Sequence, residues 1–200
     1  SGDLERVLVV GSDCLTTVVE ATDRGTAPLF GDGAGAVVLA GEPASESLPL
    51  GILACRLRAL GRLHPILYVR SGARQVSDLE GSEGDRWMRM KGQEVFRVAV
   101  EQLVDLTRET LNRAGLSPAD VALFVPHQAN LRIIRMMITQ LGIDAARVGV
   151  NLDRCGNTSA ASIPIALTEA VQSRRLHPGD VLVLNAVGGG ITAGAVVARW

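Results

Sequence analysis

Short apolar runs closed by glycine turns occur near both ends of the chain. Residues 7–10 and 34–39 form one pair of such runs, and residues 181–184 and 193–197 form another. Apolar runs of this length without polar alternation are typical of strands that are buried on both faces. The pattern therefore predicts two strand pairs, each with a glycine turn between its strands.

The two strand pairs resemble each other in sequence. The first reads VLVV, a glycine turn and AGAVV, and the second reads VLVL, a glycine turn and AGAVV. Internal similarity of this kind indicates a duplicated fold. Helices and strands precede the second pair, whereas the first pair begins almost at residue 1. We therefore expect residues 1–45 to be the end of an N-terminal half and residues 46–200 to be a C-terminal half.

Strands and helices are predicted to alternate between the two pairs. Apolar residues at helical spacing, with glycine after the last turn, indicate helices. The predicted helices are 92–113, 131–141 and 161–175, the predicted strands are 50–59, 66–70, 122–125 and 147–152, and 71–86 is a predicted polar loop. This alternation predicts an α/β fold with helices flanking a central sheet.

Composition excludes several function classes. With 47% hydrophobic and 20% charged residues, the 200-residue chain can bury a core, and no apolar run approaches the ~18 residues of a membrane span. The N-terminus does not resemble a signal peptide. A net charge of −1 and 3% aromatic residues argue against a nucleic-acid partner. Cys14, Cys55 and Cys155 form neither a metal-ligand pattern nor a disulfide framework, which favours a reduced cytoplasmic protein without a metal.

Two polar residues follow predicted strands, where α/β folds place their sites. His127 lies between a buried strand and a helix, and Asn157 lies in a loop of small and polar residues. A structural role is an alternative for each, because a lone histidine often bonds locally and Asn suits a helix N-cap. If both side chains reach one oxygen atom, they form an enolate or oxyanion site. Gly188-Gly189-Gly190 either adds a backbone donor there or is simply a tight turn.

Four segments together resemble the signature segments of the β-ketoacyl-acyl-carrier-protein synthase III family. They are TDRGTAPLFGDGAGAVVL (22–39), VPHQANLRII (125–134), GNTSAASIP (156–164) and VGGGITAGAVV (187–197). The resemblance covers essentially the whole chain. It implies a thiolase fold of five αβαβα layers, of which this chain would hold the C-terminal half and the last strands of the N-terminal half.

The resemblance also implies an activity and its residues. The family condenses an acyl-CoA primer, here expected to be acetyl-CoA, with malonyl-acyl carrier protein, using no cofactor beyond the thioesters themselves. His127 and Asn157 would stabilise the enolate that forms as CO₂ leaves, and the N–H of Gly189 would bind the oxyanion. Other matching positions are implied to bind coenzyme A (Arg24, Gln93), to line the acyl tunnel (Met90, Phe96, Val187) and to meet the acidic carrier protein (Arg132, Arg97).

Two of these positions depart from the family pattern. Gln93 stands where the family usually has asparagine, and Val187 stands where it often has phenylalanine, so a roomier primer pocket is expected. The nucleophilic cysteine of the family belongs upstream of the strand at Val7, and we expect it to lie outside this sequence. The chain would then act as a homodimer or with the missing N-terminal part. The alternative is a non-catalytic thiolase-fold subunit that binds acyl carrier protein or coenzyme A.

Overall fold

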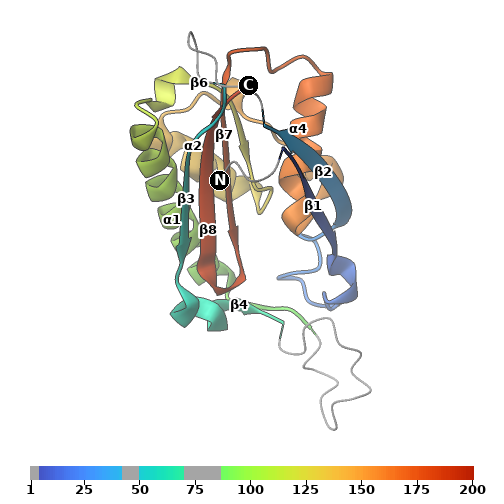
Figure 1. The fold of residues 1–200 in the computed structure, drawn as a ribbon. Helices are drawn as coiled ribbons and strands as arrows, with labels where there is room; N and C mark the ends of the chain where they lie inside the picture. The colour runs from blue at the N-terminus through green and yellow to red at the C-terminus, as the bar shows by residue number, and fades with distance from the viewer. Residues whose placement is uncertain (1–4, 42–49, 70–86) are drawn as a thin grey trace.

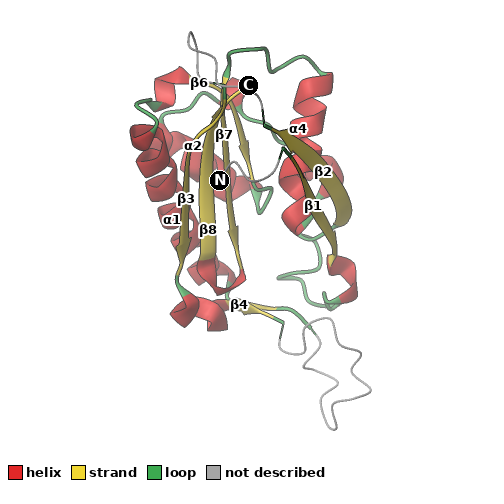
Figure 2. Ribbon diagram, viewed as in Figure 1, coloured by secondary structure: helices red, strands yellow, loops and turns green. Residues whose placement is uncertain are grey.

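The computed structural model describes residues 5–41, 50–69 and 87–200, and these form four stacked layers (Figures 1 and 2). A four-stranded sheet with the order β3-β8-β7-β6 occupies the centre. Helices α1 and α2 cover one face of this sheet, α4 covers the other, and the two-stranded β1-β2 sheet lies beyond α4. The main elements are β1 (Arg6–Cys14), β2 (Asp32–Ala40), β3 (Gly51–Ala59), α1 (Gly92–Arg113), β6 (Val121–Pro126), α2 (Leu131–Leu141), α4 (Ser162–Gln172), β7 (Val181–Gly188) and β8 (Thr192–Arg199).

Short elements connect these layers. The small strands β4 (Leu67–Tyr68) and β5 (Arg89–Met90) pair with each other, and α3 (Leu152–Cys155) is a single helical turn. The described 3₁₀ turns are η1 (Leu15–Thr17), η2 (Gly61–Ile66), η4 (Pro118–Asp120), η5 (Ala145–Arg147), η6 (Ser159–Ala161) and η7 (Gly189–Ile191).

The central sheet is mixed, and its connections explain the position of the helices. β6 and β7 are parallel, whereas β8 runs antiparallel to both β7 and β3. A parallel pair requires a crossover, and here the crossover carries α2, α3 and α4. As a result the carboxyl ends of β6 and β7 lie side by side, with Pro126 opposite Asn185.

Apolar residues are buried on both faces of the sheet. On one face Leu103 of α1 and Met137 of α2 pack with Phe124 and Val183, and each is at most 1% exposed. On the other face Leu167 and neighbouring α4 residues pack on Leu123, Val125 and Leu182. Burial of each such large side chain stabilises the fold by about 1.5–3 kcal/mol.

Glycines let the β1-β2 sheet approach the chain around α4 backbone to backbone. A Cβ atom on Gly11 would lie 2.3 Å from the carbonyl oxygen of Ala160, and one on Gly35 would lie 2.9 Å from Pro164. The Asp13 carboxylate accepts a hydrogen bond from the N–H of Ala160 at 3.1 Å. β1 and β2 pair from Arg6 with Ala40 to Cys14 with Asp32, so the whole hairpin is held against η6 and α4.

The principal elements predicted from sequence are confirmed. The two strand pairs are β1-β2 and β7-β8, both antiparallel, and α1 and α2 span the residues predicted for them. Gly142, which was expected to end the second helix, has a φ of 72° and lies directly after α2. The predicted loop 71–86 and the predicted boundary at residues 45 and 46 lie outside the described residues.

Three sequence predictions were wrong. Residues 7–10 are not buried on both faces: Leu8 is 65% exposed and Val10 60%, because described residues pack against only one face of β1-β2. Residues 147–152 do not form a strand, since only Val148 bridges to Phe124 before α3 begins. Cys55 is exposed rather than part of the core, because β3 is an edge strand in which the preceding Ala54 is the buried residue.

The close backbone contact at Gly11 predicts a strong sensitivity to one methyl group. Gly11→Ala should lower the free energy of unfolding by about 1–3 kcal/mol, because the added Cβ must displace the Ala160 backbone. Gly61→Ala is the matched control, since a Cβ there would meet nothing within 4 Å. Urea unfolding followed by circular dichroism measures both. Equal stability of the two variants would contradict the packing described here.

Candidate functional site

The loop after β6 presents His127 at the carboxyl edge of the sheet. The N–H of His127 donates to the carbonyl of Asn185 on β7 at 2.7 Å, which continues the β6-β7 pairing by one residue. Asn130 then caps α2, because its Oδ1 accepts a hydrogen bond from the N–H of Arg132 at 2.8 Å. The strand end and the helix cap together fix the three residues between them.

The His127 ring is held by a buried hydroxyl. Its Nδ1 lies 2.6 Å from the Oγ of Ser162, the first residue of α4. Burial lowers the pKa of His127 from its ordinary value of 6.5 to about 4, and the carbonyl of Ser159 opposes this shift only partly. The imidazole is therefore neutral at physiological pH.

Gln128 anchors the same loop to the segment that leads to Asn157. This side chain is fully buried, and its Nε2 donates to the carbonyls of Pro126 at 2.7 Å and Gly149 at 3.1 Å. Its Oε1 accepts from the N–H of Asn151 at 3.1 Å. All three bonds lie within the protein interior, so the His127 loop and residues 149–151 cannot move independently.

Asn157 is fixed through its backbone and its side chain. Its N–H donates to the carbonyl of Leu29 at 2.8 Å, and its carbonyl accepts from the N–H of Gly31 at 2.9 Å. Its Oδ1 accepts from the N–H of Ser159 at 2.9 Å, which defines the amide orientation. Nδ2 has one long contact, 3.4 Å to the carbonyl of Ala129, so an N–H remains to be given to a ligand.

The glycine turn between β7 and β8 forms another wall of the site. Gly190 has a φ of 69° and the buried Ile191 has a φ of 49°, which is unusual for a β-branched residue. Ile191 packs with Ile66 and Val98, and its carbonyl accepts from the N–H of Leu60 at 3.1 Å. Packing and hydrogen bonding thus hold the strained turn in place.

His127 and Asn157 line one pocket of about 400 Å³. Five other residues predicted from sequence line it as well: Met90, Gln93, Phe96, Arg132 and Val187. The guanidinium of Arg132 lies 5.8 Å from the centre of the Phe96 ring, so α2 and α1 meet at this wall. Gly189 lines an adjoining pocket of about 200 Å³ that also includes His127, Asn157 and Val187.

Two predicted residues lie outside these pockets. Arg24 is exposed and adjoins Gly25, which does line the larger pocket. Arg97 is exposed on α1, next to Phe96. Both arginines therefore lie near the pocket without forming its wall.

Neither pocket contains a thiol among its lining residues. Cys14 and Cys55 are exposed, and Cys155 is partly buried at the end of α3. Within residues 5–41, 50–69 and 87–200 there is no group of three or more His, Cys, Asp or Glu residues that could hold a metal ion. In the same ranges no helix has both the length and the apolar character needed to cross a bilayer.

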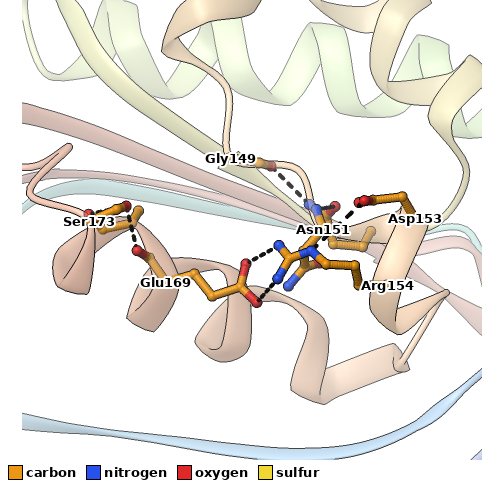
Figure 3. Close-up of polar contacts among 8 residues, drawn as sticks. Gly149, Asn151, Asp153, Arg154, Glu169 and Ser173 are labelled. Carbon is orange, nitrogen blue, oxygen red and sulfur yellow. Dashed lines mark hydrogen bonds and ion pairs between the residues drawn. The ribbon is translucent and has the colours of Figure 1, made fainter.

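A surface ion pair links α3 to α4 behind Asn157 (Figure 3). Arg154 of α3 donates to both carboxylate oxygens of Glu169, at 3.2 and 2.9 Å, and these bonds raise the pKa of Arg154. Because Arg154 is exposed, the pair contributes little to stability. Its position nevertheless helps to align the short α3 with the helix that begins at Ser162.

Sequence reasoning missed Ser162 and Gln128 as parts of the site. Ser162 was included only in a run of residues that suit helix capping, and Gln128 only as the neighbour of His127. Their partners are 34 or 35 residues distant for Ser162 and 21 or 23 for the longer contacts of Gln128. A polar residue directly beside a candidate histidine was the one available signal.

Two family descriptions match most of the chain. "3-Oxoacyl-[acyl-carrier-protein (ACP)] synthase III" matches residues 1–61, and "3-Oxoacyl-[acyl-carrier-protein (ACP)] synthase III C terminal" matches residues 111–200. A "Beta-ketoacyl-[acyl-carrier-protein] synthase III" of Rhodospirillum centenum is 46% identical over 200 residues, covering 100% of this chain and 60% of that enzyme. The chain thus spans about 60% of the length of the curated relatives it matches.

Solved structures agree with this match. The 3-oxoacyl-[acyl-carrier-protein] synthase III from Aquifex aeolicus has a TM-score of 0.86 and 43% identity, over 98% of this chain and 58% of that one. The priming β-ketosynthase from the R1128 polyketide pathway has a TM-score of 0.89 and 34% identity, over 100% and 58%. The fold is therefore thiolase-like, as expected from the sequence.

The low pKa of His127 predicts a pH dependence of stability. Between about pH 6.5 and pH 4 the unfolded chain binds a proton at this histidine that the folded chain does not bind. Stability should therefore fall as the pH is lowered through this window, by at most about 3 kcal/mol. Urea unfolding at several pH values measures it. His127→Gln should remove this component, whereas His64→Gln, at an exposed position, should retain it; the opposite result would contradict the assignment.

Proposed function

This chain belongs to the 3-oxoacyl-[acyl-carrier-protein] synthase III family, and we propose that it carries the condensing residues of such an enzyme. The observation that supports the proposal is the convergence of His127 and Asn157 on one apolar-walled pocket, each with a hydrogen-bonding group available. In the complete enzyme the reaction would extend an acyl-CoA primer, acetyl-CoA in the simplest case, and thereby initiate fatty acid synthesis.

The proposed reaction is a decarboxylative Claisen condensation. The bond between the malonyl α-carbon and its carboxylate breaks, CO₂ leaves, and the electron pair passes into the thioester as an enolate. The enolate carbon then attacks the carbonyl of the enzyme-bound acyl thioester, and the enzyme thiolate departs. The products are β-ketoacyl-acyl carrier protein, CO₂ and the free thiol, and no cofactor beyond the thioesters takes part.

Hydrogen-bond donors on the malonyl thioester oxygen are what this step requires. Negative charge moves onto that oxygen as CO₂ leaves, so donors already fixed around it favour the transition state over the ground state. The Nδ2 of Asn157 is available because Oδ1 is engaged by Ser159. His127 is neutral, so one of its ring nitrogens carries a hydrogen without placing a fixed cation in the pocket.

The remaining pocket residues are assigned to substrate binding. We place the backbone N–H of Gly189 at the oxyanion of the tetrahedral intermediate, and Arg24 and Gln93 along the coenzyme A and pantetheine path. Met90, Phe96 and Val187 would line the acyl tunnel, where valine leaves more room than the phenylalanine common in the family. All but Arg24 border one of the two adjoining pockets.

The whole enzyme would have partners that this chain alone does not define. Arg132 and Arg97 would meet the acidic acyl carrier protein, and the enzyme would act in the cytoplasm as a homodimer. Residues 1–45 would complete the N-terminal half of the fold and residues 46–200 would form the C-terminal half. The nucleophilic thiol would come from sequence outside these 200 residues, since neither pocket is lined by Cys14, Cys55 or Cys155.

Reconstitution with a relative tests the assignment of the condensing pair. The chain is combined with the part of the Rhodospirillum centenum enzyme that the match leaves uncovered, and condensation is assayed with acetyl-CoA and malonyl-acyl carrier protein. His127→Ala and Asn157→Ala should each lower the condensation rate by about 10²–10³, because each removes one donor to the enolate oxygen. Transfer of the acetyl group to the enzyme should persist in both.

His64→Ala and Asn112→Ala serve as controls, because these exposed residues lie outside both pockets. Loss of acetyl transfer in the His127 or Asn157 variant, with decarboxylation intact, would reverse the assignment. Binding of carrier protein and coenzyme A by a reconstituted assembly that never condenses would support the alternative, a non-catalytic binding subunit.

Charge reversal tests the carrier-protein contact. Arg132→Glu should weaken binding of acyl carrier protein and flatten its salt dependence, because a cation at the pocket mouth is replaced by an anion. Arg56→Glu, at an exposed position on β3, is the matched control. Titration calorimetry at two salt concentrations measures both. An unchanged dissociation constant for Arg132→Glu at low salt would remove this residue from the contact.

A further inference from the structure

Ser162 connects the two loops that carry the condensing pair. It is 1% exposed and is the first residue of α4, which begins five residues after Asn157. Its Oγ lies 2.6 Å from Nδ1 of His127 and 3.3 Å from the N–H of Gln128. One hydroxyl group therefore contacts two adjacent residues of the opposite loop.

The hydrogen of this hydroxyl has one available acceptor. The N–H of Gln128 can only donate, so it must give its hydrogen to Oγ. Among the described residues no other hydrogen bond supplies an acceptor for the Ser162 hydroxyl. If Nδ1 also donated to Oγ, the hydroxyl hydrogen would be left buried without a partner, which costs about 1–3 kcal/mol.

We propose that Ser162 is a positioning residue that donates its hydroxyl hydrogen to Nδ1 of His127 and thereby keeps the ring hydrogen on Nε2. A neutral imidazole carries a hydrogen on one nitrogen only, so the bond at Nδ1 determines what Nε2 can do. With Ser162 in place, Nε2 is the donor nitrogen. The proposed condensation needs such a donor, and in that respect the inference rests on the proposed function.

Two neighbouring features bear on the tautomer. The N-terminus of α4 is the positive end of its helix dipole, and at Ser162 it lies against the ring, where it disfavours an imidazolium ion. The carbonyl of Ser159 also faces the ring and accepts from whichever nitrogen carries the hydrogen. Removal of the Ser162 hydroxyl would leave that carbonyl free to attract the hydrogen to Nδ1.

The tautomer can be read directly by NMR in the full chain. The chain has three histidines, so a variant with His64→Gln and His177→Gln, both at exposed positions, retains His127 alone. After ¹⁵N-histidine labelling, long-range ¹H–¹⁵N spectra at neutral pH should show a hydrogen on Nε2. Adding Ser162→Ala should produce an Nδ1–H population, whereas Ser162→Thr, which keeps the hydroxyl, should retain the original tautomer.

Matched controls make each outcome decisive. Ser173→Ala removes a hydroxyl from the other end of α4, where it bonds the carbonyls of Glu169 and Ala170, and should leave the tautomer unchanged. An Nδ1–H tautomer in the parent protein would overturn the proposal, whether or not Ser162→Ala folds. An unchanged Nε2–H tautomer in a folded Ser162→Ala variant would do the same.

The reconstituted enzyme gives a second, separate readout. Ser162→Ala should lower kcat for condensation about tenfold, the equivalent of one hydrogen bond, with KM little changed, and Ser162→Thr should restore it. Unchanged kcat in Ser162→Ala would contradict the positioning role. If the parent assembly itself fails to condense, the proposed function fails, while the NMR result still decides the tautomer.

Discussion

The site depends on backbone contact between the segment around Asn157 and the β1-β2 hairpin. Asn157 exchanges hydrogen bonds with Leu29 and Gly31, at 2.8 and 2.9 Å, although these residues are more than 120 positions apart. Such contact requires small residues, since a Cβ on Gly31 would lie 2.3 Å from the carbonyl oxygen of Cys155. The two family descriptions match on either side of this contact, so a feature of the fold, rather than of one loop, positions the amide.

The chemistry of His127 follows from the same enclosure. Burial lowers its pKa to about 4, so the ring remains neutral and acts through hydrogen bonds rather than charge. A neutral ring has two possible tautomers, and its neighbours must select one of them. Ser162 touches Nδ1, and Gln128 ties the loop to residues 149–151, so both the orientation and the hydrogen position of the ring depend on buried polar contacts.

Sequence patterns predicted the elements better than their environment. The boundaries of α1 and α2 followed from helical periodicity and glycine stops, and the duplication correctly paired β1 with β2 and β7 with β8. The burial of residues 7–10 was wrong, because an apolar run does not reveal what packs against it. The resemblance supplied His127 and Asn157, but Ser162 and Gln128 act through contacts across 21 to 35 residues, and no local pattern encodes these.

The central claim is that His127 and Asn157 donate hydrogen bonds to one thioester oxygen. Isotope-edited infrared spectroscopy tests it most directly, with a ¹³C=O-labelled malonyl thioester analogue that cannot decarboxylate, bound to the reconstituted assembly. Two donors should weaken the C=O bond and lower its stretching frequency relative to water, and His127→Ala and Asn157→Ala should each reverse part of that shift. A carbonyl frequency that neither substitution changes would contradict the account.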